Sequence, residues 1–113
     1  MHRLDFAFQP IIDIHSGSLY GCEALLRGTD KAGFASIDSF FETAYAEGAL
    51  CHIEPDLRKM AMRKFREAGL QTQALLFYNL DNRLLECPNA DPRAFLADAE
   101  NMGLGHHFCR LIS

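Results

Sequence analysis

The chain has 113 residues, of which 49% are hydrophobic and 23% are charged. These proportions predict a single soluble globular domain and exclude intrinsic disorder, which requires fewer apolar residues and a larger charge imbalance. The formal net charge of -4, from 11 Lys+Arg against 15 Asp+Glu, argues against broad electrostatic attraction to nucleic-acid polymers or to anionic membranes.

The N-terminal residues predict a β-hairpin. Residues 4–14 form an apolar segment rich in Phe and Ile, which is typical of a strand buried on both faces. His15 to Ser18 have turn chemistry, because Gly17 supplies a positive φ and the serines can bond to nearby backbone. A second apolar strand follows over residues 19–27, and residues 28–33 are expected to form a surface loop.

Two helices are expected next. The first begins near Ser36, a good N-cap, and carries an apolar stripe at helical spacing as far as Gly48. The second begins around Glu54 and Pro55, since Pro is tolerated in the first turn of a helix, and Gly69 ends it. We assign four basic residues of this second helix to its solvated face: Lys59, Arg63, Lys64 and Arg66.

The rest of the chain alternates strands and helices. Residues 74–81 predict a third strand, which a short polar and helical segment follows as far as Cys87. A helix over about residues 92–102 and a strand from residue 107 come last. The order β-β-α-α-β-α-β favours an α/β sheet or barrel with a parallel portion. Because parallel sheets normally have more strands and two covered faces, we expect the front half of a larger architecture.

Polar residues interrupt three of the apolar strands. Side chains alternate between the two faces of a strand, so Glu23, Leu25 and Arg27 share one face. Glu23 and Arg27 are roughly 13 Å apart at about 3.3 Å per residue, so each is expected to have a separate partner. Gln9 lies in the first strand, and Asn79 lies near the carboxyl end of the third, where parallel α/β architectures bind ligands. These residue types suit Mg²⁺ or Mn²⁺ and phosphate, and a buried structural hydrogen-bond network is the alternative.

The cysteines and the chain's first residues bear on its cellular location. Cys22, Cys51, Cys87 and Cys109 include no closely spaced pair of the kind that zinc sites use. No apolar run reaches the roughly 20 residues of a membrane-spanning helix, and the first residues do not form a secretory signal. We therefore expect reduced thiols, a cytoplasmic location, and neither a nucleic-acid polymer nor a membrane as partner.

Three short segments carry a family resemblance. Residues 8–13 read FQPIID and residues 21–27 read GCEALLR. These two segments resemble the opening of EAL domains, the cyclic-di-GMP-specific phosphodiesterases of bacteria, whose pattern runs YQPIVD…G-x-EALLRW. Residues 77–80, FYNL, resemble the family's VNLS strand, and Gly28 stands where the family usually has Trp. The resemblance covers the whole chain but only the first half of an EAL domain.

The resemblance implies a fold, an activity and a set of site residues. The fold is a partial (β/α)₈ barrel with an antiparallel first strand, in which residues 1–113 are the truncated N-terminal part of a single EAL domain. The intact domain would hydrolyse cyclic di-GMP to linear pGpG with two divalent metals, Mg²⁺ or Mn²⁺, clamping the attacking and leaving oxygens. By the same resemblance Glu23 and Asn79 would be metal ligands. Gln9, Leu25 and Arg27 would contact the nucleotide.

Several parts of the family pattern do not occur in this sequence. The missing parts include a DDFGTG-like segment with its two aspartates. On one alignment Leu111 takes the place of a metal-binding Glu, and on another the chain stops just before it. We therefore expect no phosphodiesterase activity from this chain, and the alternative is a degenerate EAL module that binds cyclic di-GMP or another protein. Unpaired strand edges are templates for association, so a homo-oligomer through the open sheet edge is also expected.

Overall fold

A four-stranded mixed sheet lies at the centre of the computed structural model, which describes residues 4–87, 92–105 and 107–112. The strands are β1 (Asp5–Ile12), β2 (Leu19–Arg27), β3 (Leu75–Leu80) and β4 (Phe108–Ile112), and they lie side by side in that order. β1 is antiparallel to β2, whereas β2, β3 and β4 are parallel. The predicted antiparallel first strand is therefore confirmed.

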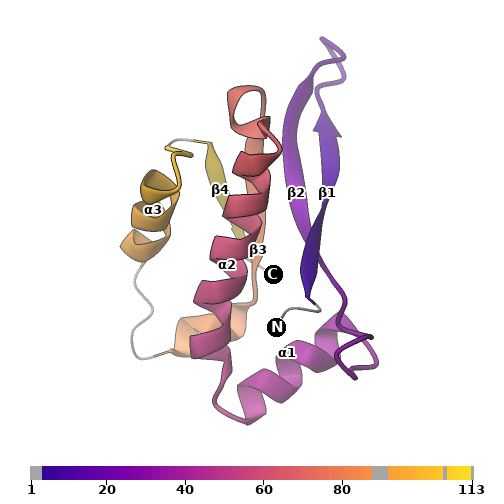
Figure 1. Cartoon of the computed structure of the whole chain (residues 1–113), viewed down its shortest axis with the longest axis vertical. Helices are drawn as coiled ribbons and strands as arrows, with labels where there is room; N and C mark the ends of the chain where they lie inside the picture. Colours follow the sequence, from indigo (N-terminus) through magenta and orange to yellow (C-terminus); the bar gives the residue numbers. More distant parts are fainter. Residues whose placement is uncertain (1–3, 88–91, 106, 113) are drawn as a thin grey trace.

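The helices lie on one face and at one end of this sheet. They are α1 (Ile37–Ala46), α2 (Leu50–Glu67) and α3 (Pro92–Asn101), with short 3₁₀ segments η1 (Leu70–Thr72) and η2 (Asn82–Glu86). In Figure 1, α2 and α3 lie against the sheet, and α1 crosses the end toward which β2 and β3 run. The predicted element order is confirmed. No helix among the described residues combines the length and apolar character that crossing a membrane requires.

The hydrophobic core lies between α2 and the face of the sheet that α2 covers. Alternate residues of the strands point into it, including Phe6 of β1, Ala24 of β2 and Leu76 of β3. Leu57 and Phe65 of α2 pack against them and have almost no exposed surface. Burial of each such side chain contributes about 1.5–3 kcal/mol to the free energy of unfolding, so this face holds the helices in place.

The other face of the sheet is open. Ala7 and Gln9 of β1 and Asn79 of β3 are exposed, and Glu23 and Leu25 of β2 are half-buried. The expectation that the first strand is buried on both faces is therefore wrong. The described helices pack on one face only, so only every second residue of β1 reaches the core.

Helix α2 departs from prediction at its start. It begins at Leu50 rather than near Glu54, so Pro55 lies inside the helix. Pro55 lacks the N–H that would bond to the carbonyl of Cys51, a loss that a helix tolerates better near its first turn than in its middle. The predicted N-cap of α1 is confirmed, because the Ser36 hydroxyl accepts a hydrogen bond from the backbone N–H of Ser39.

Lys64 is not simply part of a solvated helix face. Its Nζ lies 2.9 Å from Oδ2 of Asp5 and donates to the carbonyl of Phe6 at 2.6 Å. The hydrogen bond from Lys64 holds the pKa of Asp5 below its ordinary value. Helical periodicity describes one helix alone and therefore predicts that Lys64 faces water. In the fold β1 lies beside α2 and provides the partners of Lys64.

Cys51 and Cys87 form a disulfide, so the expectation of reduced thiols is wrong for this pair. Their Cα atoms are 5.9 Å apart although 36 residues separate them in the chain. Sequence spacing gives no sign of the pairing, because the pairing depends on η2 returning to the first turn of α2. Among the cysteines whose side chains are described, Cys22 is free, and burial raises the pKa of its thiol.

Candidate functional site

Glu23 and Asn79 meet on the open face of the sheet. The Nδ2 of Asn79 donates a hydrogen bond to Oε2 of Glu23 at 2.6 Å. The register explains this contact, because Glu23 is paired with Phe77, and Asn79 is two residues further along β3 on the same face. Glu23 and Asn79, which the family resemblance implies as metal ligands, thus lie on one face of the sheet. The partner of Glu23 is thus an amide on the next strand.

Gln9 and Leu25 extend the same surface. Gln9 lies opposite Glu23 in the antiparallel ladder between β1 and β2, and Leu25 lies opposite Ala7. Residues that are directly opposite in such a ladder have side chains on the same face. Gln9, Glu23 and Asn79 therefore come from three adjacent strands, and the fold brings them together as the sequence predicted. We call this surface, formed by Gln9, Glu23, Leu25, Arg27 and Asn79, the open-face site.

Arg27 lies at the carboxyl end of β2. Its side chain is exposed, and its Nη1 donates to the carbonyl of Leu26 at 3.1 Å. Arg27 is paired in register with Asp5 and makes no described ion pair with Glu23. The guanidinium is therefore at the rim of the open-face site, where it can reach a ligand from solvent.

A cavity of about 170 Å³ opens at the carboxyl ends of β2 and β3. Leu25, Arg27 and Asn79 line it from the strands, and Ile37 and Phe41 line it from α1. Its volume is below the roughly 300–1,000 Å³ of pockets that enclose a drug-sized ligand. It can therefore enclose only part of a ligand of that size, with the remainder lying on the exposed face.

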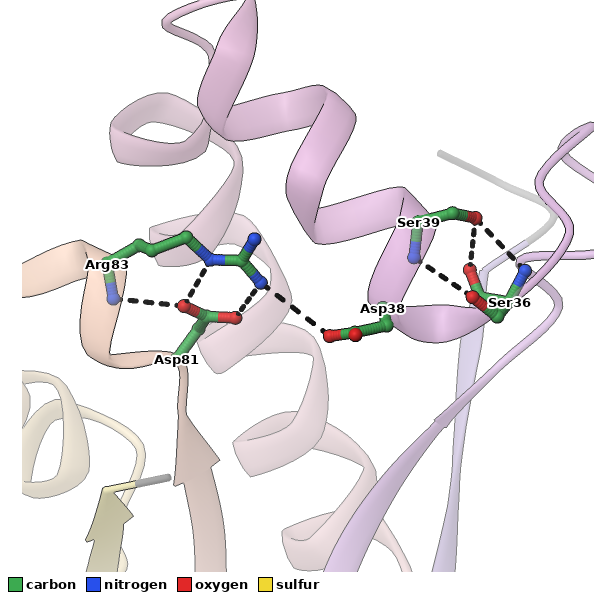
Figure 2. A network of polar contacts seen from close by, with 5 residues as sticks. All are labelled: Ser36, Asp38, Ser39, Asp81 and Arg83. Atoms are coloured by element: carbon green, nitrogen blue, oxygen red, sulfur yellow. Dashed lines mark hydrogen bonds and ion pairs between the residues drawn. The ribbon is translucent and has the colours of Figure 1, made fainter.

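A polar network fixes the chain immediately after Asn79. Asp81 accepts hydrogen bonds from the backbone N–H of Arg83 at 2.9 Å and from its Nε at 2.7 Å. Figure 2 shows the Arg83 guanidinium between Asp81 and Asp38, whose Oδ1 is 3.8 Å from Nη2 of Arg83. The hydrogen bond from Arg83 keeps the pKa of Asp81 below its ordinary value. Asp81 thereby caps the start of η2, and no local sequence pattern indicates the link from Arg83 to α1.

A second network lies behind β3, on the covered face. Arg58 contacts Glu54 at 2.8 Å and Asp98 at 2.7 Å, and the hydroxyl of Tyr78 donates to Glu54 at 3.1 Å. Arg58 also stacks over the ring of Phe95, with its Cζ 4.1 Å from the ring centroid. Burial raises the pKa of both Glu54 and Tyr78. This network joins α2, β3 and α3. The four-residue spacing of Glu54 and Arg58 on one helix is a sequence signal for the ion pair between them, but not for the contacts with Asp98 and Tyr78.

The open-face site supplies only part of a metal-binding set. The carboxylate of Glu23 and the amide oxygen of Asn79 are hard oxygen donors of the type that Mg²⁺ prefers. The residues that the structure describes include no group of three or more His, Cys, Asp or Glu placed to hold a metal ion. Leu111 is the register partner of Asn79 on β4, so an apolar residue occupies that position of the ladder. Two protein oxygens fit one hydrated ion and do not complete a two-metal site.

Comparison with known proteins identifies solved structures of the same fold. No family model matches the sequence, and no curated protein matches it. The EAL enzyme Bd1971 in its cGMP-bound form has a TM-score of 0.76 and 19% identity, over 99% of this chain and 33% of that chain. A standalone EAL protein from Vibrio cholerae O395 with bound c-di-GMP has a TM-score of 0.62 and 21% identity, over 96% of this chain and 44% of that chain.

A third structure, the PaMucR phosphodiesterase in complex with c-di-GMP, has a TM-score of 0.67 and 23% identity, over 97% of this chain and 46% of that chain. This chain therefore spans between a third and a half of the chains it matches. At these identities the likeness establishes the fold, and the fold is the expected partial (β/α)₈ barrel with an antiparallel first strand.

Proposed function

We propose that this chain is the N-terminal part of a bacterial EAL domain and that its open-face site binds cyclic di-GMP together with a divalent cation. The observation that carries the proposal is the 2.6 Å contact between Asn79 and Glu23. In this contact the two residues that the motifs mark as metal ligands meet on adjacent parallel strands, Asn79 near the carboxyl end of β3 and Glu23 in the middle of β2. Solved structures of this fold contain c-di-GMP, which supports the same ligand here. A cytoplasmic location belongs to this proposal.

Each residue of the open-face site has a role in this proposal. Glu23 and Asn79 hold Mg²⁺ or Mn²⁺ through the carboxylate and the amide oxygen. Gln9 and Leu25 contact the nucleotide, and Arg27 binds a phosphate through its planar pair of donors. When bound, the cation supplies positive charge opposite the phosphates, which a chain with a net charge of -4 otherwise lacks.

Hydrolysis is assigned to the intact domain. Hydrolysis requires two metal ions that stabilise the attacking and the leaving oxygen, and the two protein oxygens of Glu23 and Asn79 do not complete both metal sites. We expect the 113-residue chain to release no pGpG from cyclic di-GMP in the presence of Mg²⁺ or Mn²⁺. Chromatography of the reaction products tests this, and metal-dependent pGpG formation by the purified chain would contradict it.

A degenerate EAL module that only binds cyclic di-GMP or another protein is the second candidate. The register position of Leu111 next to Asn79 favours it, because no carboxylate lies there. A chimera in which residues 1–113 replace the matched part of the PaMucR phosphodiesterase separates the two candidates. If the chain derives from an active enzyme, the chimera hydrolyses cyclic di-GMP and Glu23→Gln abolishes this activity. A degenerate module predicts a chimera that binds the nucleotide without hydrolysing it.

Self-association through the open sheet is part of the proposal. β1 and β4 are the edges of the sheet, and Ile11 and Phe77 are half-buried apolar residues of its open face. Edge strands with unpaired backbone groups are templates for pairing with a second copy. Size-exclusion chromatography with light scattering should give a dimer or larger species, which Ile11→Lys on the β1 edge reduces to a monomer. A monomer at all concentrations of the unaltered chain would contradict self-association.

A further inference from the structure

The Cys51–Cys87 disulfide joins two elements beside the exit of β3. Cys51 lies in the first turn of α2, and Cys87 immediately follows η2. The segment over residues 81–87 begins two residues after Asn79 and contains the Asp81–Arg83 pair. We call this segment the β3 exit segment. The disulfide therefore fastens the chain that leaves the open-face site to a helix whose own position is fixed by the core.

Few other described contacts hold the β3 exit segment. The ion pair from Arg83 to α1 spans 3.8 Å, and the side chain of its partner Asp38 is 84% exposed. The hydroxyl of Tyr45 on α1 bonds to Glu86, and both residues are exposed. Exposed pairs of this kind contribute little because water and salt screen them. Leu84 is the segment's buried apolar anchor among its described side chains. The covalent bond is thus the strongest single link from this segment to α2.

The disulfide is also accessible from solvent. Cys51 is exposed and Cys87 is half-buried, whereas Cys22 is only 4% exposed. Exchange requires that an attacking thiolate reach a sulfur atom, and exposed disulfides are the labile ones for this reason. The bond therefore combines access for a thiol with a position at which breaking it frees a defined segment.

We propose that Cys51–Cys87 is a thiol–disulfide exchange site whose substrate is an external thiol and whose reduction releases the β3 exit segment from α2. A thiolate attacks Sγ of Cys51, forms a mixed disulfide there, and expels Cys87 as a thiolate that takes up a proton. A second external thiolate attacks the external sulfur of the mixed disulfide and releases Cys51, which is protonated in turn. Two external thiols thus become one external disulfide, and the two electrons reduce the protein bond to two thiols.

Hydrogen–deuterium exchange of the full chain tests this proposal without any nucleotide. Addition of dithiothreitol should release two additional titratable thiols and raise exchange in residues 81–87 at least tenfold. The centre of α2, residues 57–65, should keep its protection because the core holds it. Cys22→Ala is the matched control and should respond as the unaltered chain does. A Cys51→Ser and Cys87→Ser double variant should show fast exchange in residues 81–87 before any reductant is added.

The proposal fails on any of three outcomes. The first is that dithiothreitol releases no additional thiols, which would mean that the bond is absent or inaccessible. The second is that residues 81–87 exchange equally fast before and after reduction. The third is that reduction of the unaltered chain removes protection from residues 57–65 as well, which would make the bond a general support of the fold. Reduction of the unaltered chain decides all three, so the proposal does not depend on the folding of the double variant.

Discussion

Asn79 on β3 donates a hydrogen bond to Glu23 on β2 at 2.6 Å, across two parallel strands and on the face that no described helix covers. A carboxylate acceptor makes this bond stronger than one between neutral groups. Neither side chain is buried in the core, so the fold does not require the pair for packing. Both side chains belong to the open-face site, where the proposed ligand would contact them.

Gly21 is expected to be intolerant of any side chain. A Cβ at this position would lie 2.5 Å from Cε2 of Phe77 and 3.0 Å from the carbonyl oxygen of Leu75. The backbone oxygen cannot move without disturbing the β2–β3 ladder. Gly21→Ala should therefore lower the free energy of unfolding by about 1–3 kcal/mol, the usual cost of overpacking. Urea denaturation followed by circular dichroism measures this value.

Gly21→Ala made in a Phe77→Ala background tests whether contact with the Phe77 ring causes this loss of stability. Removing the ring takes away the nearest contacts of the new methyl group, so Gly21→Ala should cost less there. Coupling between contacting residues is about 0.5–3 kcal/mol. An equal cost in both backgrounds would show that the contact with Phe77 does not explain the glycine.

Arg58 is expected to be the most sensitive charged residue of α2. Its guanidinium lies between the carboxylates of Glu54 and Asp98, and Arg58→Leu would leave both acids without their cation. Removing one partner of a buried ion pair costs about 3–5 kcal/mol. Thermal unfolding should show a large loss of stability for Arg58→Leu and little change for Arg63→Leu, an exposed position on the same helix. Similar losses for both variants would contradict the assignment.

Asp81 should make stability depend on pH in the acid range. Arg83 lowers the pKa of Asp81, so the folded state favours the charged carboxylate. This contribution is present above the unfolded-state pKa and is lost as the pH falls through the lower folded-state value. An Asn at position 81 can still cap η2, so Asp81→Asn removes the negative charge and keeps the cap. The variant should have the lower melting temperature at about pH 6, and the difference should vanish at about pH 2. A difference that persists at low pH would exclude this cause.

Local sequence pattern predicted the parts of the fold that depend on neighbouring residues. The alternation in β2 correctly put Glu23, Leu25 and Arg27 on one face of the strand, and the turn chemistry at Gly17 correctly predicted the hairpin. These features depend on periods of two residues and on turn chemistry, which a single sequence displays.

Contacts between distant segments could not be predicted in this way. The Cys51–Cys87 bond and the contact of Arg58 with Asp98 each join residues that lie far apart in the chain. Helix α2 begins earlier than the predicted start near Pro55, because Leu50 packs into the core and the helix starts there. Tertiary packing overrides local preference in such places.

Calorimetric titration of cyclic di-GMP into the full chain, with Mg²⁺ present, tests the central claim most directly. The account predicts saturable binding that weakens at least tenfold in Asn79→Ala and in Glu23→Gln. Asn101→Ala, which removes an exposed amide from the end of α3, should bind as the unaltered chain does. Equal affinity in Asn79→Ala and the unaltered chain, or no binding by the folded unaltered chain, would contradict the account.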